Sequence, residues 1–350
     1  MSLAGRLYRG ETNFDLVGNR RRWYIASAIL ILVCVASFVF RGFNFGIEFA
    51  GGNQYLVPAT DRATVASVRA AVASTGVTVA SAQQVGSGSN RRIQVRTPEL
   101  KPDQVSTVKD AIAKKVGVDQ SNISDDAVSS SWGSDVTRKA LTGLLVFLIA
   151  VCVYIGFRFE PKMAIAAIAA LVHDVIVAAG IYSLVGFEVT PSTVVGLLTI
   201  LGFSLYDTVV VFDKVAENSK GLLGGSRMTF SEAANLAVNQ TFMRSINTSL
   251  IALLPVAGLL FVGAGLLGVG TLKDLALVLF VGLASGAYSS LFLATPVLAD
   301  LKEREPAYAA LRQRVIAKRA GAAVAPARRP GRSGSAPAAQ RAAVQSPTAT

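Results

Sequence analysis

Six stretches of this sequence are apolar over roughly 20 residues, the length of helix that crosses a hydrocarbon core of about 30 Å. They lie near residues 23–40, 139–157, 163–186, 192–212, 242–263 and 271–298. Hydrophobic residues make up 52% of the 350 and charged residues only 16%, which excludes an ordinary soluble protein. The sequence therefore predicts a polytopic α-helical membrane protein with six transmembrane helices. The first stretch is too long for a signal peptide and no cleavage site follows it.

The distribution of Lys and Arg predicts how these helices are oriented, because positively charged connections stay in the cytoplasm. Arginines at 20–22 precede the first helix, and the connections at 158–162 and 213–241 also carry Lys or Arg. The connections at 187–191 and 264–270 carry neither. Six helices with both chain termini in the cytoplasm satisfy every connection.

These boundaries divide the chain into five parts. They are a cytoplasmic N-terminus (1–22), transmembrane helix 1 (23–40), an external domain (41–138), transmembrane helices 2–6 (139–298), and a basic, largely disordered cytoplasmic tail (299–350). The external domain has strand-like and helix-like segments in the order β-α-β-β-α-β, which is typical of the ferredoxin-like α+β fold. Gly51 and Gly52 near its start allow a bend, and we expect them to form a hinge.

The net charge of +12 comes largely from the tail, which could touch anionic lipid or ribosomal RNA. A solvated tail is the simpler interpretation, and we expect no nucleic-acid partner. Cys34 and Cys152 both lie in predicted helices, where they resemble small apolar side chains rather than a disulfide or a metal site. The sequence predicts no metal and no cofactor.

Asp207 lies within the fourth apolar stretch, six residues before its polar end at Asp213. An ionised carboxylate inside the hydrocarbon costs on the order of 3 kcal/mol, so its presence needs a reason. On a helix, Ser204, Asp207 and Thr208 share one face, which should point toward other helices. Asp207 is either an interhelical hydrogen-bonding group or a group that binds and moves a proton. We favour the proton, because Arg244 supplies a partner.

A second polar stripe begins the fifth apolar stretch, formed at helical spacing by Gln240, Arg244, Asn247 and Thr248. Arg244 enters from the same side of the membrane as Asp207 and reaches a similar depth, so we expect the two to pair. An arginine there could instead extend to the lipid headgroups. The inward continuation of the stripe favours a position inside the bundle.

Near the middle of the third apolar stretch lie His173, the only histidine of the chain, and Asp174. Asp174 is a second candidate for a proton pathway by the same argument from cost. His173 is either a proton relay or a hydrogen-bonded core residue. Because neighbouring helical residues point about 100° apart, we expect these two side chains not to pair with each other.

Five motifs in fixed order give the chain a resemblance to a known family over roughly residues 10–300. They are Phe45-Gly-Ile-Glu-Phe-Ala-Gly-Gly52, Phe157-Arg-Phe-Glu-Pro161, His173-Asp-Val175, the stretch from Gly202 to Asp213, and Arg244-Ser-Ile-Asn-Thr-Ser249. Together they resemble the SecF family, the smaller subunit of the SecD–SecF accessory complex of the protein-export translocase. The sequence departs from the family pattern at Glu48, where Asp is usual, at Tyr206, where Asn is common, and at Ala216, where a basic residue is common.

This resemblance implies a subunit of the plasma membrane of a prokaryote that pairs with SecD and acts beside the SecYEG translocon, with YajC and YidC as further neighbours. It implies the use of the proton-motive force to help translocate preproteins. Asp207 and Arg244 match the family's proton-pathway positions, and the external domain would move about its glycine-rich root. No catalytic residue is implied, and we do not expect an enzyme.

Three other functions deserve comparison. The resemblance also implies membership of the resistance-nodulation-division-like transporter superfamily. A self-sufficient efflux pump of that superfamily would hold two six-helix halves, whereas this chain holds one, so an efflux transporter subunit is the nearer alternative. An intramembrane aspartyl protease would need a Gly-x-Gly-Asp motif, and Asp174 follows Leu171-Val-His instead. A structural subunit of the translocon without a titrating group is the third.

Overall fold

The computed structural model describes residues 14–86, 91–266 and 273–324. Within these ranges six helices are long and apolar enough to cross a membrane, by length and composition. They begin with Arg20–Arg41 (α2), Ser130–Arg158 (α6), Pro161–Val185 (α7), Pro191–Ser219 (α8), Phe230–Ala257 (α9) and Lys273–Ser289 (α10). Helix α9 continues as the π-helical turns η4 (Gly258–Leu266), and α10 as η6 (Ser290–Ala294) and helix α11 (Thr295–Glu303). All six predicted stretches are confirmed, apart from residues 271–272, which lie outside the described residues.

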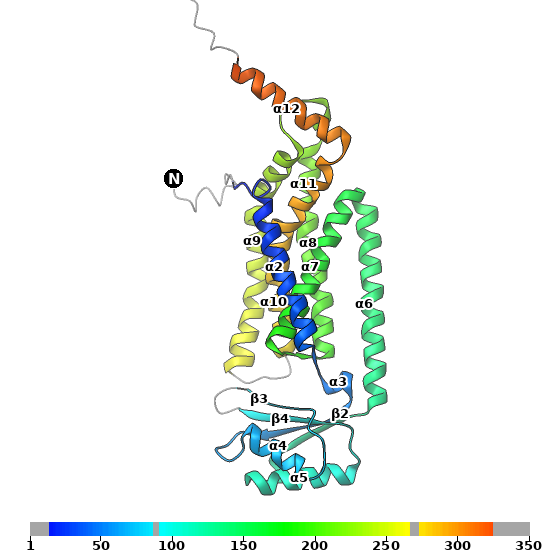
Figure 1. The fold of residues 1–350 in the computed structure, drawn as a ribbon, viewed down its shortest axis with the longest axis vertical. Coiled ribbons are helices and arrows are strands. Elements are labelled where there is room, and N and C mark those ends of the chain that lie inside the picture. The colour runs from blue at the N-terminus through cyan, green and yellow to red at the C-terminus, as the bar shows by residue number, and fades with distance from the viewer. Residues whose placement is uncertain (1–13, 87–90, 267–272, 325–350) are drawn as a thin grey trace, which may run out of the picture.

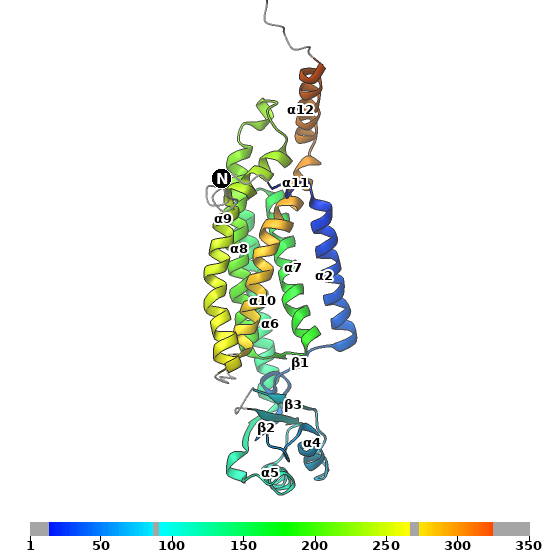
Figure 2. The ribbon, with the colours of Figure 1, turned by 90° about the vertical axis from the view of Figure 1, so that its left-hand side faces the viewer.

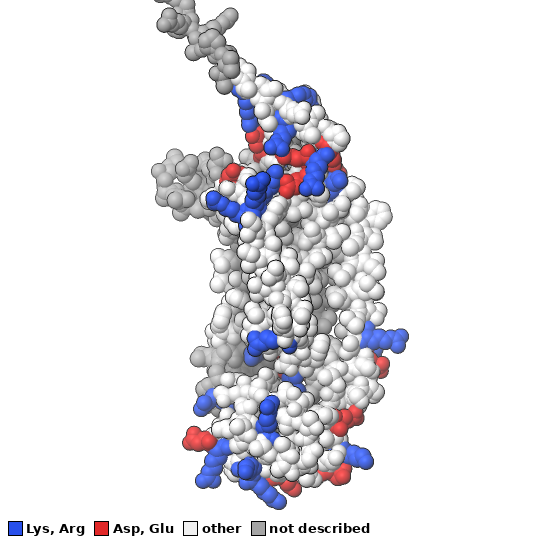
Figure 3. Space-filling model, viewed as in Figure 1, with Lys and Arg blue, Asp and Glu red and all other residues white. Residues whose placement is uncertain are grey.

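The long helices run side by side along the long axis of the molecule, with an α+β domain at one end and helix α12 (Pro306–Val324) at the other (Figures 1 and 2). Charged side chains gather at both ends, and the middle of the visible face is almost free of them (Figure 3). This pattern fits a membrane-embedded middle, because charged groups are costly in hydrocarbon.

Local sequence signals determine where several helices begin. Pro191 occupies the first position of α8, where its fixed φ suits a helix start. The hydroxyl of Thr190 accepts a hydrogen bond from the backbone N–H of Thr193, and Thr229 caps α9 through the N–H of Glu232 in the same way. These caps satisfy backbone donors that a helix start leaves free, and they fix where α8 and α9 enter the bundle.

Helices α8 and α10 pack closely because glycines lie at their contact. A Cβ atom added at Gly282 would lie 1.9 Å from Cδ1 of Ile200, and one added at Gly196 would lie 2.2 Å from Cγ1 of Val278. Small residues of this kind let helix backbones approach each other inside a membrane. By contrast, α6 lies at the edge of the bundle (Figure 1), and most of its side chains are exposed.

The α+β domain lies between α2 and α6. Its elements are β2 (Gly52–Pro58), α4 (Val65–Ala73), β3 (Ser81–Val85), β4 (Arg92–Thr97), α5 (Pro102–Val116), the 3₁₀ turn η2 (Gln120–Asn122) and β5 (Ser124–Val128). The strands form one sheet in the order β3-β4-β2-β5, and all neighbours are antiparallel. Two β-α-β units therefore interlock, each with a strand of the other between its own, which confirms the predicted element order. The buried core includes Tyr55, Val68, Ile93 and Ile112.

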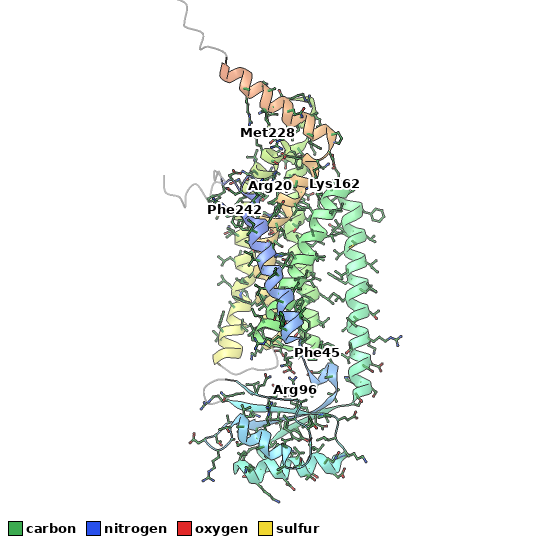
Figure 4. The ribbon with its side chains drawn as sticks, in the orientation of Figure 1. Arg20, Phe45, Arg96, Lys162, Met228 and Phe242 are labelled. Carbon is green, nitrogen blue, oxygen red and sulfur yellow. The ribbon has the colours of Figure 1, made fainter. Side chains whose placement is uncertain are left out.

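Three contacts hold together the sheet of this domain, its root and the α7–α8 connection of the bundle. Strand β1 (Asn44–Phe45) pairs in parallel with β6 (Glu188–Val189), which connects α7 to α8. Arg96 of β4 forms a salt bridge with Glu188 and donates a hydrogen bond of 2.8 Å to the carbonyl of Phe45, at the junction seen in Figure 4. The short helix α3 (Ile47–Ala50) completes the root.

Gly51 and Gly52 end this root in backbone conformations that favour glycine, with φ of 71° and 116°. A Cβ atom at Gly52 would lie 2.3 Å from the carbonyl oxygen of Thr97, and one at Gly51 would lie 2.8 Å from Cα of Ser130. The two positions therefore need glycine for geometry and for space. Their action as a hinge stays a prediction.

Within the tail that the sequence predicts to be largely disordered (299–350), residues 299–324 form most of α11 and the whole of α12. Leu311 and Val315, one helical turn apart, are fully buried, and Tyr308 packs edge-on against Phe230 with ring centroids 5.0 Å apart. The composition is basic, yet these apolar side chains at helical spacing bury one face of α12 against the bundle. Residues 325–350 lie outside the described residues.

Candidate functional site

Asp174 of α7 lies at the centre of a hydrogen-bonded cluster in the bundle interior. The residue is 1% exposed, and three serine hydroxyls donate to its carboxylate. Ser204 of α8 donates across 2.5 Å, and Ser285 and Ser289 of α10 donate across 2.8 and 2.7 Å. The cluster joins three helices around one acid, and a buried carboxylate with this many donors is satisfied without a basic partner.

His173 also contacts Asp174, so the prediction that these neighbours do not pair is wrong. Nδ1 of His173 lies 3.2 Å from Oδ1 of Asp174. The 100° between neighbouring helical positions fixes only where each side chain starts, and rotation of both side chains brings their ends together. The other ring nitrogen, Nε2, is buried and has no hydrogen-bond partner among the described residues. The ring lies 5.9 Å from that of Tyr288.

Asp207 of α8 is the second buried acid, with 3% of its surface exposed. The hydroxyl of Ser290 donates to its Oδ2 across 2.6 Å. Ser204 and Thr208 on the same face of α8 are buried too, and the hydroxyl of Thr208 donates to the carbonyl of Ser204. The prediction that this stripe faces other helices is confirmed.

Arg244 does not pair with Asp207 in this structure. Its guanidinium is exposed and donates to the hydroxyl of Tyr206 across 3.5 Å. Tyr206 and Asp207 are neighbours on α8, and Tyr206 points outward with 52% of its surface exposed while Asp207 points toward η6. The predicted ion pair is therefore absent among the described contacts, because Arg244 reaches from α9 to Tyr206 on the outer face of α8, whereas Asp207 lies on the inner face.

The rest of the α9 stripe also faces away from the interior of this chain, contrary to the prediction. Gln240 and Asn247 are exposed, and Thr248 is half-buried with its hydroxyl donating to the carbonyl of Arg244. Spacing alone predicted the stripe correctly but not its direction, since any face of a helix can turn inward. The polar face of α9 is directed outward from the bundle.

Sequence reasoning missed the serines of α10 and η6 that hold both acids. Ser285, Ser289 and Ser290 are buried in the last span, and none of them was among the predicted site residues. The i, i+4 spacing of Ser285 and Ser289 is a signal that could have identified them, because hydroxyls so spaced face one neighbouring helix.

The possible metal ligands, the two cysteines and the acid at the domain root do not form a comparable cluster among the described residues. Among the described residues, no three His, Cys, Asp or Glu side chains are grouped closely enough to hold a metal ion. Cys34 is buried, where its Cβ and Sγ would contact a side chain added at Gly180, and Cys152 is exposed. At the domain root, burial raises the pKa of the Glu188 carboxyl above its ordinary value, and the charge of Arg96 only partly opposes this.

Comparison with known proteins adds to this geometry. Residues 108–304, which include both buried acids and Arg244, match the family model described as protein export membrane protein SecD/SecF, C-terminal. Residues 36–61, which include Gly51 and Gly52, match the model described as SecD/SecF GG motif. The chain belongs to the SecD/SecF family.

Individual relatives place it nearer to SecF. The chain is 47% identical to protein translocase subunit SecF of Streptomyces coelicolor over 91% of this chain and 85% of that protein. It is 50% identical to the protein translocase subunit SecF of Mycobacterium tuberculosis, over 91% of this chain and 74% of that protein. A crystal structure of SecDF from Thermus thermophilus, described as a translocon-associated membrane protein, superposes with a TM-score of 0.74 at 31% identity. That match covers 87% of this chain and 40% of the SecDF chain.

Proposed function

We propose that this chain is the SecF-type subunit of a prokaryotic protein translocase, and that it couples proton movement across the plasma membrane to preprotein export. The SecF relatives, which cover most of the chain at about half identity, support the translocase role. The observation that carries the proton role is Asp207, a carboxylate 3% exposed in the apolar part of α8. An ionised side chain at that depth costs free energy, and we therefore infer that Asp207 has a function.

A SecD-type subunit is the partner that we propose for this chain, with the SecYEG translocon beside the pair. The SecDF of Thermus thermophilus joins a SecF-like part to further sequence in one chain. Arg244, Gln240 and Asn247 point outward from α9. Arg244 contacts Tyr206, seven residues inside Asp213, or about 10 Å along the helix. A lipid-facing arginine at this depth is costly, so a partner helix should cover the face.

In the proposed cycle Asp207 takes up a proton from the outside and releases it to the cytoplasm. Ionised Asp207 attracts the guanidinium of Arg244, which must leave Tyr206 to reach it. Protonation removes that attraction and allows α8 and α9 to repack. Because β6 immediately precedes α8 and pairs with β1, movement of α8 is transmitted to the domain root at Gly51 and Gly52. The domain would then move a bound preprotein outward.

One proton crossing a potential of 100 mV carries about 2.3 kcal/mol. That free energy shifts an equilibrium between two conformations by a factor of about fifty, since about 1.4 kcal/mol corresponds to tenfold. A single titrating carboxylate is therefore sufficient to drive a change between two packings of the bundle.

The test replaces Asp207 and measures preprotein translocation into sealed vesicles, with and without an uncoupler. Asp207→Asn retains the size and hydrogen bonding of the side chain but cannot ionise. We expect normal levels in the membrane, normal partner binding and loss of the uncoupler-sensitive part of export. Asp213→Asn on the same helix is the matched control, because Asp213 is half-exposed and pairs with Arg158 at 2.7 Å. Full uncoupler-sensitive export by Asp207→Asn would leave Asp207 as a structural hydrogen-bonding group.

The proposed orientation has its own test, in a background lacking Cys34 and Cys152. A cysteine at Ser106, on the exposed face of α5, should react with an impermeant thiol reagent from outside. A cysteine at Gly224, in the 3₁₀ turn η3 (Leu222–Gly224) after α8, should react only after the membrane is opened. The reverse pattern would overturn the orientation and the direction of proton flow.

A further inference from the structure

Ser289 and Ser290 are consecutive residues that hydrogen-bond to two different buried acids. Ser289 donates to Oδ2 of Asp174 across 2.7 Å, and Ser290 donates to Oδ2 of Asp207 across 2.6 Å. Both serines are fully buried. Asp174 lies on α7 and Asp207 on α8, so this one dipeptide connects the last span to both acid-bearing helices.

Each of these hydroxyls also lies near a second acceptor on its own helix. The Oγ of Ser289 is 3.3 Å from the carbonyl oxygen of Gly286, and the Oγ of Ser290 is 3.3 Å from that of Ala287. Ser204 and Ser285, the other donors to Asp174, have the carboxylate as their hydrogen-bond acceptor. The presence of two acceptors therefore distinguishes the dipeptide from the other serines of the cluster.

A hydroxyl carries one proton and can donate one strong hydrogen bond at a time. While the carboxylate is ionised, it accepts that bond, as the shorter distances indicate. When the carboxylate takes up a proton, it becomes a donor itself, and the serine must direct its own proton elsewhere. The backbone carbonyl three residues earlier is in place to accept it. No buried polar group is then left unpaired in either state, which avoids a cost of about 1–3 kcal/mol.

We propose that Ser289 and Ser290 are positioning residues whose hydroxyls transfer their hydrogen bonds from a carboxylate to their own helix when the carboxylate is protonated. For Ser290 this rests on the proposed function, since it requires that Asp207 binds a proton. The exchange breaks no covalent bond: the proton that arrives on Asp207 now donates to Oγ of Ser290, and the Ser290 proton turns to the carbonyl of Ala287.

The backbone at this place gives independent support. The α-helical part of α10 ends at Ser289, and the π-helical turn η6 starts at Ser290. π-helical turns are rare and are frequent at functional sites, because the extra residue leaves a local register that can change. The turn begins at Ser290, whose hydroxyl gives up its hydrogen bond to Asp207 in this proposal. Proton uptake by Asp207 therefore acts directly on the backbone of the last span.

Among the described residues, few charged or titratable groups surround the dipeptide. Asp174, which His173 contacts, faces it from α7, and Asp207 faces it from α8. Tyr288 precedes it on α10 with its ring 5.9 Å from that of His173, while Arg244 of α9 lies on the outer face against Tyr206. A pH-dependent change at Ser290 therefore has Asp207 as its direct source, and Asp174 and His173 act on it through Ser289.

The experiment compares Ser290→Ala with Ser290→Thr in vesicles that contain the chain with its partner. Alanine removes the hydroxyl without adding bulk, whereas threonine keeps the hydroxyl and adds a methyl group in a fully buried site. We expect Ser290→Ala to lose about tenfold or more of the uncoupler-sensitive translocation rate, the factor for one hydrogen bond to a charged group. Ser290→Thr should recover most of it. Thr241→Val is the matched control, since Thr241 is buried and its hydroxyl donates only within α9.

Infrared difference spectra between high and low pH measure the hydrogen bonding of the Asp207 carboxyl group directly. A change of packing alone would not shift this carboxyl band. The carboxyl band that Asp207→Asn removes should shift in Ser290→Ala and stay near its normal position in Ser290→Thr. An unshifted band in Ser290→Ala overturns the inference, whatever the transport rate. Normal uncoupler-sensitive export in Ser290→Ala, with that export lost in Asp207→Asn, would overturn it too and leave the proposed function standing. Normal export in Asp207→Asn would instead overturn the proposed function.

Discussion

The guanidinium of Arg244 donates to the hydroxyl of Tyr206, while the next residue, Asp207, accepts from Ser290 on the opposite side of α8. One helical position thus separates a side chain on the outer face from one in the interior. The proposed proton cycle requires Arg244 to leave Tyr206, so the bond between them belongs to one state of the cycle only.

This arrangement predicts opposite results for two substitutions. Arg244→Met should lose the uncoupler-sensitive part of export, because Asp207 then has no cation to attract it. Tyr206→Phe should retain most of that activity, because the 3.5 Å bond is weak and its loss frees Arg244. Translocation into sealed vesicles with and without an uncoupler measures both. Arg158→Met is the control for loss of a positive charge, as Arg158 is half-exposed at the end of α6. Equal losses in all three variants would contradict the prediction.

Close packing of α8 against α10 predicts that Gly282→Ala destabilises the bundle. The added Cβ would meet Cδ1, Cγ2 and Cβ of Ile200 at 1.9, 2.8 and 2.9 Å, and the Cβ cannot move aside without the backbone. Overpacking of this kind costs about 1–3 kcal/mol. Gly202→Ala on α8 is the matched control, since nothing lies within 4 Å of its added Cβ. The melting temperature of the purified protein should fall in Gly282→Ala only. Equal melting temperatures for the two variants would show that the α8–α10 contact can rearrange to accept the added methyl group.

The salt bridge between Arg96 and Glu188 predicts that the stability of the domain root depends on Arg96. The two side chains are 6% and 14% exposed, so Arg96→Met would leave a buried carboxylate without its cation. Breaking such a pair costs about 3–5 kcal/mol. Arg92→Met, on the same strand but exposed, is the control. We expect a lower melting temperature and faster proteolysis at the domain root in Arg96→Met alone. Equal behaviour of the two variants would show that the β1–β6 pairing suffices.

Glu188 and Glu99 should contribute to folding stability with opposite dependences on pH. Burial raises the pKa of Glu188, so the folded protein binds this proton more readily than the unfolded chain, and stability falls as pH rises through the folded pKa. Glu188→Gln resembles the protonated form, so its stability relative to the natural protein should increase with pH. Hydrogen bonds from Ser130 lower the pKa of Glu99, so its contribution is present above the ordinary pKa of glutamate and is lost as pH falls.

Melting curves of Glu188→Gln and Glu99→Gln across the acidic range check both signs. Glu99→Gln should be less stable than the natural protein at neutral pH and equal to it at low pH. Glu188→Gln loses its salt bridge with Arg96, but its stability relative to the natural protein should rise from low to neutral pH. A common trend in both variants would contradict the assignment of the shifts to local burial and local hydrogen bonds.

The contacts of helix α12 with the connection between α8 and α9 should protect that connection from proteolysis. Arg314 donates to the carbonyl of Leu223, and Arg319 forms a bidentate pair with Glu232 at 2.6 and 3.0 Å. Truncation after Glu305 removes these contacts, and we expect faster tryptic cleavage at Lys220 and Arg227. Truncation after residue 324 keeps α12 and serves as the control. The same cleavage rate in both truncations would mean that α12 does not hold the connection.

The sequence by itself determined the architecture. Six apolar stretches of sufficient length leave a chain no other way to bury its backbone in lipid than as helices, since each unsatisfied peptide group there is costly. Alternating segments between the first two stretches determined the order of elements in the α+β domain. The cost of an intramembrane carboxylate likewise singled out Asp207 and Asp174, because that cost depends on residue type and depth alone.

Only the tertiary structure decided which groups these acids bind. Spacing along a helix defines a face but does not say what that face meets, so the stripe of Arg244 and Asn247 was predicted to point inward and points outward. Ser290 lies 83 positions from Asp207, Ser285 and Ser289 lie 111 and 115 positions from Asp174, and no local pattern relates them. Glycines let α10 approach α8 closely, and contacts of this kind are set by the packing of helices distant in sequence.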